Sequence, residues 1–509
     1  MRPAPANLDS RIVFAILLAA SLMPVLLTPI PAMVDYPNHL ARMYLIARAG
    51  TPDANPYYQI VWALYPNLAM DLIIPQMARA LGVENASRLF LLLSQLSIVG
   101  GAMTLEYVVK GRIHIAGFVA VMFLYCLPFA WGFLNFEFGL GLALFGIAAM
   151  LAAQDRAWPF RFGLNTILVA TLFAAHFFAL GIYGVTIGLL ELWRARELHA
   201  APVQTALRLT LLAIPVLILL AIMAATAGSI GGEGTEWFFQ FKPLWLFRIM
   251  NGYSLTVSSV AVVALLAAIY DAAKRGVLAF APGGLWLAIG FAILYLAIPS
   301  RLFGTSFVDF RMIAAAALIL PTFCTLVLPT PRWKHLALTG VSVITLANLA
   351  VVYFVWLSYR ADYAAMIHSF RKIERGSLVL AGDSDAGDDP PFHDLTGYPM
   401  YYAPTLAVNY ANAFVPGLFT AAGKQPVRVG PIEERLAIPH GGPVPVSILA
   451  AIANGKTAAA VPAYIKSWTR DYDYLYVLGP RIANPMPELL EELESSSRFA
   501  LYRIRRKPG

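Results

Sequence analysis

Long apolar runs that recur along most of the chain constrain this sequence most strongly. A helix needs about 20 predominantly apolar residues to cross a bilayer, and runs of about that length follow one another with short polar breaks. We predict eleven membrane spans, at 12–30, 86–109, 114–131, 137–153, 164–176, 177–193, 206–227, 254–270, 281–299, 311–328 and 335–357. Only 13% of the residues are charged, against roughly a quarter in soluble globular proteins. The sequence therefore predicts a polytopic α-helical membrane protein.

Lysine and arginine predict which of the short loops face the cytoplasm. If the N-terminus is inside, the short cytoplasmic loops are 110–112, 156–161, 194–208, 274–275 and 332–334. Each of these loops is basic, whereas the opposite short loops at 133–138 and at His176 contain no lysine or arginine. The pattern predicts a cytoplasmic N-terminus and an outer C-terminus, and it suits a bacterial inner membrane. These loops also account for much of the net charge of +8, and we find no nucleic-acid-binding motif.

The composition changes after the last predicted span. Residues 1–357 would form the transmembrane domain, and residues 358–509 a small extracytoplasmic α/β domain, because apolar runs shorten there while Gly, Pro, Asp and Tyr increase. Short runs rich in β-branched and aromatic residues predict strands, and they occur at 377–382, 474–479 and 499–504. We predict a helix over 487–496, PELLEELESS, before the last strand.

The segment between the first two spans, residues 31–85, is too long for a turn and is rich in apolar residues. DYPNHLARMYLIARAG predicts a helix that begins with Pro37 in its first turn. PNLAMDLIIPQMARALG, at 66–82, predicts a second helix with a break at Pro75. Charged residues interrupt both, so we expect these helices to lie along the outer membrane surface rather than to cross it.

This layout resembles the GT-C superfamily of integral-membrane glycosyltransferases, including the ArnT-like and protein O-mannosyltransferase-like families. In that superfamily an acidic residue follows the first span, in an outer loop with two surface helices, as VDYPNHLAR does here. The resemblance continues through ASRLFLLLSQLSIVGGA to the basic turn KGR and the outer phrase LNFEFGLGLAL. It covers about the first 200 residues in layout, and the remainder more loosely.

The resemblance implies an enzyme that moves a hexose or pentose from a polyprenyl-phosphate carrier to an acceptor outside the membrane. Asp35 would be the general base, and the attacked sugar carbon would invert. The acceptor is a glycan, a lipid or a protein. Many relatives carry paired acids in the first loop, but Tyr36 follows Asp35 here. The missing second acid argues against a divalent metal, so no cofactor is predicted. The other interpretation of Asp35 is an N-cap of the first surface helix.

Further polar residues near the predicted outer face are candidates for binding the substrate. His39 and Arg42 follow Asp35 by four and seven residues, which places all three on one helical face. They would bind donor phosphate or orient Asp35, or else anchor the helix to lipid headgroups. Asn135 and Glu137 stand at the start of an apolar span, where a carboxylate is costly unless it is paired or functional. The alternative for Glu137 is a structural partner for an arginine.

His176 lies alone within a long apolar stretch, either facing the donor or packed in the core. The later outer loops supply the cations Lys242, Arg248, Arg301 and Arg311. One or two of them would meet the donor phosphate, because guanidinium groups bind phosphate in a bidentate fashion. The others would pair with Asp309 or touch headgroups.

Two other functions remain open from the sequence. A lipid or polysaccharide transporter or flippase would also be polytopic, but we see no inverted halves with matching broken helices. A non-catalytic membrane scaffold would not need Asp35, Glu137 and several cations near one face.

Overall fold

A computed structural model describes residues 8–226, 234–302, 305–387, 397–438, 441–456 and 461–506. The chain forms two compact units. The first comprises residues 1–27, 64–69 and 89–353, and the second comprises residues 28–63, 70–88 and 354–509. The predicted domain boundary at 357/358 lies close to the division at 353/354. Most of the first outer loop, which we assigned to the transmembrane domain, belongs to the second unit.

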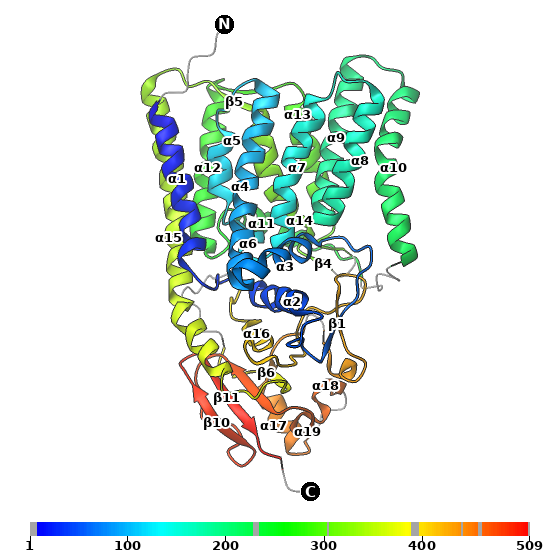
Figure 1. Ribbon diagram of the computed structural model, residues 1–509. Helices are drawn as coiled ribbons and strands as arrows, with labels where there is room; N and C mark the ends of the chain where they lie inside the picture. The colour runs from blue at the N-terminus through cyan, green and yellow to red at the C-terminus, as the bar shows by residue number, and fades with distance from the viewer. Residues whose placement is uncertain are drawn as a thin grey trace. The chain divides into compact units, whose positions relative to one another are not determined.

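The first unit is a helical bundle whose long members run side by side (Figure 1). Its main helices are α1 (Leu8–Leu27), α4 (Val83–Lys110), α5 (Ala116–Phe123), α6 (Leu127–Trp131), α7 (Leu134–Ala152), α8 (Trp158–Ala175), α9 (Phe177–Glu197), α10 (Pro202–Thr226), α11 (Lys242–Arg248), α12 (Leu255–Lys274), α13 (Gly284–Ala297), α14 (Val308–Ile319) and α15 (Pro331–Phe370). Helices α4 and α15 continue into the second unit.

Short elements complete the first unit. They are the 3₁₀ helices η1 (Phe239–Phe241) and η2 (Leu320–Phe323), and the strands β2 (Leu278–Phe280), β3 (Arg301–Leu302), β4 (Thr305–Ser306) and β5 (Cys324–Leu326). β2 pairs with β5, and β3 pairs with β4, both antiparallel. These two ribbons link ends of the helices α12 to α14.

Each of the eleven predicted spans contains a helix, which confirms the polytopic helical class. Eight of the described helices are long and apolar enough to cross a membrane: α1, α4, α7, α8, α9, α10, α12 and α15. Shorter apolar helices lie over 116–131 and 284–297. Two predicted spans are interrupted. The span at 114–131 breaks at 124–126 between α5 and α6, and the span at 311–328 ends as an α-helix at Ile319.

The second unit joins the outer loop to the C-terminal residues. From the loop come α2 (Tyr36–Arg48), β1 (Tyr58–Ile60) and α3 (Ala69–Leu81). β1 pairs antiparallel with β7 (Val427–Val429), more than 350 residues later in the chain. Helix α3 runs unbroken through Pro75, so the predicted break is wrong. Only one backbone N–H is lost there, and the amphipathic face of α3 continues across the proline.

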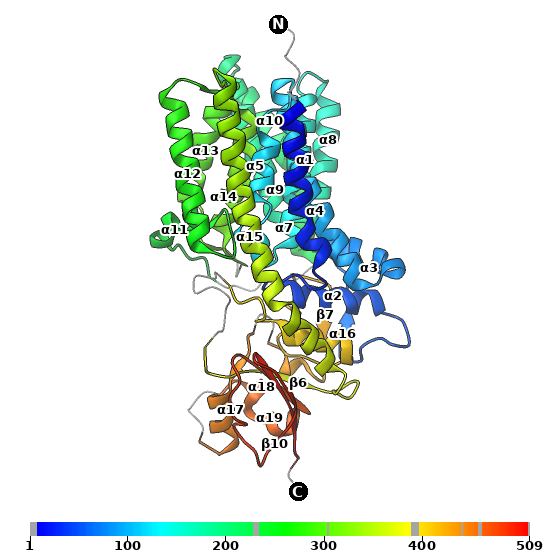
Figure 2. The same cartoon turned by 90° about the vertical axis from the view of Figure 1, so that its left-hand side faces the viewer.

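The C-terminal part is a mixed five-stranded sheet with helices beside it (Figure 2). Its strand order is β10-β11-β9-β6-β8, with β6 (Val379–Asp383) parallel to both β8 (Val444–Pro445) and β9 (Tyr474–Leu478). Strands β11 (Phe499–Ile504) and β10 (Leu490–Ser495) add on antiparallel. The short helices are η3 (Ala403–Leu406), α16 (Ala407–Ala411), η4 (Glu434–Leu436), α17 (Val446–Ala453), α18 (Ala463–Lys466) and α19 (Trp468–Asp471).

The three strands predicted from local sequence are present as β6, β9 and β11. The predicted helix over 487–496 is wrong, because Leu490–Ser495 is the edge strand β10. Leu490 is buried beside Ile504, and Glu491 lies opposite Arg503 on β11. Pairing with β11 therefore overrides the helix propensity of the Leu and Glu residues, as tertiary contacts commonly do.

Candidate functional site

Asp35 stands at the beginning of α2 in the second unit. It occupies the N-cap position, with Pro37 in the first turn, and its backbone carbonyl accepts a bond of 3.0 Å from the amide of His39. The Asp35 carboxylate makes no capping hydrogen bond to the α2 backbone. Asp35 is partly exposed, whereas the three residues that follow it are buried. The helix thus fixes the position of Asp35 without using its carboxylate as the cap.

Aromatic side chains from the C-terminal residues surround the first turns of α2. The His39 ring meets the edge of Phe419 at 5.7 Å between centroids, and Phe419 meets Tyr402 at 5.1 Å. Burial raises the pKa of Tyr402, and the negative charge of Asp35 raises it further. Asp35 therefore lies within electrostatic range of Tyr402, in a partly buried environment where charges are weakly screened.

Asn38 connects α2 to this aromatic segment. Its side chain is fully buried, donates to the carbonyl of Gly417 at 2.9 Å and accepts from the amide of Phe419 at 2.8 Å. Both ends of the amide are thus used, one turn after Asp35. We did not identify Asn38 from the sequence, because nothing local distinguishes it from the polar residues of an exposed helix.

Arg42 forms a buried ion pair in the second unit. Its guanidinium lies 3.0 Å from a carboxylate oxygen of Asp71 on α3, and the two side chains are 5% and 0% exposed. A second guanidinium nitrogen lies 3.5 Å from Oε1 of Gln425. Burial raises the pKa of Asp71, and Arg42 lowers it in part. The sequence marked both residues as interruptions of apolar helices, but it gave no sign that they pair.

Glu137 and Arg311 lie in the interior of the first unit. Glu137 is 1% exposed on α7, and the Cys126 thiol donates to its Oε1 at 3.5 Å. Arg311 is 6% exposed on α14 and packs its guanidinium over Phe133, 4.2 Å from the ring centroid. The charge of Arg311 is within electrostatic range of Glu137 and of His176.

His176 and Asn135 belong to one polar turn of the first unit. His176 separates α8 from α9, and its Nδ1 accepts from the amide of Phe178 at 3.1 Å, which caps α9. The side-chain amide of Asn135 donates to the backbone carbonyl of Asn67 at 2.5 Å. The backbone amide of Phe177 donates to the side-chain oxygen of Asn67 at 2.8 Å. Since Nδ1 accepts, the other ring nitrogen of His176 carries the proton of the neutral ring.

The four predicted cations differ in their surroundings. Lys242 donates to the carbonyls of Tyr295 and Ile298 at 2.7 and 2.8 Å and lies 3.7 Å from Asp309. Burial lowers the pKa of Lys242, and Asp309 raises it in part. Ser300 donates to Asp309 at 2.6 Å. This buried set holds the end of α13 against α14 and α11.

Arg248 and Arg301 make fewer polar contacts than Lys242. Arg248 packs over Trp245 at 5.7 Å from its ring centroid and is half-buried. Arg301 is exposed and lies 3.5 Å from Glu236. Arg248 and Arg301 thus have only a ring contact and an exposed ion pair among their described contacts.

An apolar groove opens between α9 and α13 in the first unit, with a volume of about 260 Å³. One face of α9 lines it at Phe178, Gly181, Ile182 and Val185, and the opposite wall is the end of α13 with Met312. Phe178 is hydrogen-bonded to His176, and Met312 follows Arg311. Two lining residues of the groove are thus direct neighbours of His176 and Arg311, one through a hydrogen bond and one along the chain. No periodic signal in the sequence distinguishes such a groove from an ordinary lipid-facing helix surface.

Among the described residues, no group of three or more His, Cys, Asp or Glu side chains is placed to hold a metal ion.

Comparison with known proteins gives one consistent result. No protein-family model matches the sequence, and no curated protein does. The crystal structure of ArnT from Cupriavidus metallidurans in the apo state matches over 97% of this chain and 97% of its own, at 12% identity and a TM-score of 0.51. The same protein bound to undecaprenyl phosphate matches over 98% of both chains, at 12% identity and a TM-score of 0.52. The chain thus shares the ArnT fold over nearly its whole length, which confirms the GT-C resemblance at the level of fold.

Proposed function

We propose that this chain is a membrane glycosyltransferase that moves a sugar from a polyprenyl-phosphate donor to an acceptor outside the membrane, with Asp35 as the general base. The observation that carries the proposal is the position of Asp35 in a fold shared with ArnT over 97% of the chain. Asp35 opens the first surface helix, partly exposed, and its carboxylate does not cap that helix.

The chemistry needs one base and one displacement. Asp35 takes the proton of the acceptor hydroxyl while that oxygen attacks the anomeric carbon of the donor. The bond from the anomeric carbon to the phosphate oxygen breaks, and the phosphate leaves with the electron pair on its lipid carrier. A single displacement inverts the configuration at the anomeric carbon. A positioned carboxylate in this role contributes on the order of 10²–10⁴-fold in rate.

The apolar groove between α9 and α13 is the proposed site of the donor's prenyl chain. Its lining residues are apolar, its volume is about 260 Å³, and its residues Phe178 and Met312 adjoin His176 and Arg311. We propose that the guanidinium of Arg311 and the imidazole N–H of His176 bind the phosphate of the same lipid. The bound undecaprenyl phosphate in the solved ArnT structure supports a donor of this class. We propose Arg248 and Arg301 as further phosphate contacts, and no metal or other cofactor in the reaction.

The other predicted residues take supporting roles in this proposal. His39 orients the loop that carries Asp35 through its contact with Phe419. Asn135 and Glu137 shape the polar turn and the interior next to Arg311. Arg42 holds α2 against α3 through Asp71, and Lys242 holds α11 against α14 through Asp309. The N-terminus is proposed to be cytoplasmic and the second unit to lie outside a bacterial inner membrane.

The first test is Asp35→Asn in purified full-length protein given a polyprenyl-phosphate-sugar donor and membrane extracts as the acceptor source. Transfer should fall by about 10²–10⁴-fold with little change in melting temperature, because asparagine keeps the size of the aspartate side chain. Asp53→Asn is the matched control, since Asp53 is an exposed acid of the same loop, 3.8 Å from Arg375. Normal transfer by Asp35→Asn would refute Asp35 as the general base, whereas the absence of transfer by the wild type would favour a transporter.

The second test fills the groove with Gly181→Leu. Open space surrounds a side chain at Gly181, and the same is true of Gly184 and Gly188 on α9, which do not line the groove. Gly181→Leu should raise KM for a long-chain donor, whereas Gly184→Leu should leave it unchanged. A donor with a short prenyl chain should show no difference between the two variants. Equal effects of Gly181→Leu and Gly184→Leu would rule out the groove as the donor site.

A further inference from the structure

Residues 412–420, NAFVPGLFT, form a segment of the second unit that lies outside the helices and strands. All of them except Gly417 are buried. Buried backbone amides and carbonyls that belong to no helix or sheet need other hydrogen-bond partners. The partners of the 412–420 segment therefore show which part of the chain holds it in place.

The first outer loop supplies many of these partners. The Asn38 side chain donates to the carbonyl of Gly417 at 2.9 Å and accepts from the amide of Phe419 at 2.8 Å. The Tyr58 hydroxyl donates to the carbonyl of Val415 at 3.1 Å and accepts from its amide at 3.0 Å. Two side chains of the loop thus satisfy four backbone groups of the segment.

Asn55 makes a comparable connection at the other end of the segment. Its side chain donates to the carbonyls of Asn412 and Ala413 at 3.0 and 3.1 Å. Asn38 and Asn55 are both buried, at 0% and 6% exposed. They differ in their place along the loop, because Asn38 lies in the first turn of α2, three residues after Asp35, whereas Asn55 lies beyond the end of α2.

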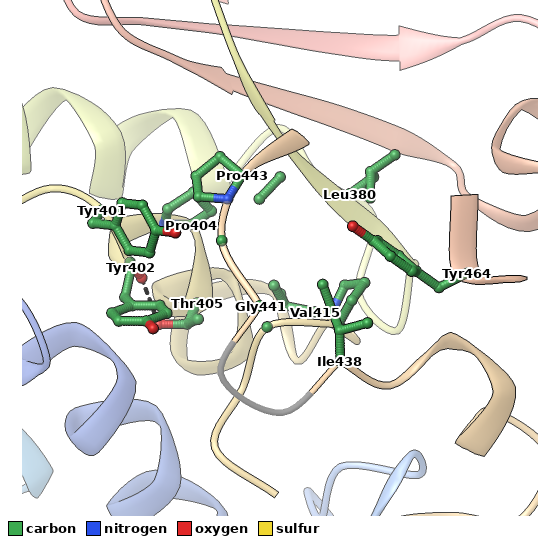
Figure 3. A pocket seen from close by; sticks show the side chains of 14 residues that line it. Leu380, Tyr401, Tyr402, Pro404, Thr405, Val415, Ile438, Gly441, Pro443 and Tyr464 are labelled. Atoms are coloured by element: carbon green, nitrogen blue, oxygen red, sulfur yellow. Dashed lines mark hydrogen bonds between the residues drawn. The ribbon is translucent and has the colours of Figure 1, made fainter. Parts of the chain in front are cut away.

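An aromatic contact also connects the segment with the surroundings of Asp35. Phe419 lies 5.7 Å from the ring of His39 and 5.1 Å from the ring of Tyr402, measured between centroids. Tyr402 is within electrostatic range of Asp35. The Thr405 hydroxyl donates to the Tyr402 carbonyl at 2.7 Å (Figure 3). Phe419 thus contacts both α2 and a tyrosine near Asp35.

We propose that the 412–420 segment positions Asp35 for proton transfer, with Asn38 as the positioning residue that connects them. The inference rests on the proposed function and deepens it, because the C-terminal residues then complete the Asp35 site instead of forming a separate binding module. Rates of catalysis are sensitive to such positioning, since a displacement of about 1 Å can cost about 10²-fold. Loss of the Asn38 bonds should therefore slow the chemical step more than it weakens substrate binding.

Asn38→Leu in the purified full-length protein removes both bonds at nearly constant side-chain size. In the transfer assay kcat should fall by about 10–100-fold. KM for the polyprenyl-phosphate-sugar donor should stay within about twofold of wild type, because the proposed donor contacts lie in the first unit. Asn38→Ser keeps a hydroxyl for one of the two partners and covers the case in which Asn38→Leu does not fold. Its kcat should be intermediate, and a wild-type kcat in either variant would overturn the inference.

Asn55→Leu is the matched control for the stability of the segment. It removes two bonds to the same segment from a similarly buried asparagine, so it should lower the melting temperature about as much as Asn38→Leu does. Its kcat should nevertheless stay within about twofold of wild type. Equal losses of kcat in Asn38→Leu and Asn55→Leu would mean that both act through stability alone and would overturn the inference.

Asp35→Asn shows whether Asn38 acts through Asp35. In the Asp35→Asn background, Asn38→Leu should change the residual transfer by less than about threefold, because the base that Asn38 positions is already lost. A fall by the same factor in both backgrounds would show that Asn38 acts independently of Asp35.

Hydrogen exchange separates this inference from the proposed function, since it needs no activity. Asn38→Leu should accelerate exchange in the first two turns of α2, and Asn55→Leu should leave exchange there unchanged. If exchange responds in this way but Asp35→Asn transfers normally, the general-base proposal fails and the hold of the segment on α2 stands. If transfer depends on Asp35 but neither kcat nor exchange in α2 responds to Asn38→Leu, only the positioning role fails.

Discussion

The buried pair between Arg42 and Asp71 allows a sharp test of what Arg42 does. From the sequence, Arg42 was a candidate phosphate ligand or a headgroup anchor. In the structure its side chain is 5% exposed and lies 3.0 Å from a carboxylate that is fully buried. The perturbation is a double-mutant cycle of Asp71→Leu, Arg42→Met and the two together.

The expected magnitude follows from the burial of both charges. Removing one partner of a buried ion pair leaves the other charge uncompensated, which costs about 3–5 kcal/mol. A domain of about 150–250 residues loses roughly 2–4 °C of melting temperature per kcal/mol. Asp71→Leu should therefore lower the melting temperature of the second unit by about 6–20 °C. Replacing both charges with apolar residues of similar size is often neutral or stabilising, so the double variant should recover most of this loss.

Scanning fluorimetry of the purified full-length chain in detergent supplies the stability measurement, and the transfer assay is run on the same samples. If Arg42 is structural, the double variant regains both stability and transfer. If Arg42 binds donor phosphate, the double variant is stable but inactive. A double variant that is as unstable as Asp71→Leu would refute the reasoning about the buried pair, because charge compensation would then not be its main contribution.

Further outcomes follow from other contacts. Burial raises the pKa of Asp71 above 3.8, so the folded chain keeps this proton at pH values where the unfolded chain has lost it. The stability contributed by Asp71 is present below pH 3.8 and is lost as the pH rises through its folded pKa. The melting temperature of the wild type should therefore fall over this pH range, and that of Asp71→Asn should not. An equal fall in the wild type and in Asp71→Asn would contradict this assignment. Ser300→Ala removes the 2.6 Å bond to buried Asp309 and should cost about 1–3 kcal/mol in chemical denaturation. A change below measurement error would mean that Lys242 and the amide of Phe310 satisfy Asp309 without the serine. Tyr58→Phe leaves the amide and carbonyl of Val415, bonded at 3.0 and 3.1 Å, without their partner; hydrogen exchange at Val415 should accelerate, and unchanged exchange would show that this hydroxyl does not hold the segment.

Local patterns explain why the helical part could be predicted. Apolar runs mark the spans whatever their neighbours are, because the bilayer requires that length. Pro37 marks the start of α2, and the β-branched and aromatic runs mark β6, β9 and β11. Each of these features is encoded within a short stretch of sequence.

The missed features depend on partners far apart in the sequence. Leu490–Ser495 is a strand only because β11 lies beside it, with Glu491 opposite Arg503. The partner of Arg42 lies 29 residues away on another helix. Asn38 bonds to residues that follow it by almost 380 positions. No short stretch of sequence contains both members of such a pair, so the roles of these side chains could not be predicted from local sequence.

The pairing of β1 with β7 has a consequence for how the protein is made. Residues 58–60 leave the ribosome about 370 residues before their partners at 427–429. At a synthesis rate of about 5–20 residues per second, the loop that carries Asp35 waits roughly 20–70 s for the strand that completes it. During that time its apolar side chains and the unpaired edge of β1 are accessible to chaperones and proteases. A stop codon or a translational pause before residue 427 should therefore yield a chain whose spans have inserted but whose first loop is degraded.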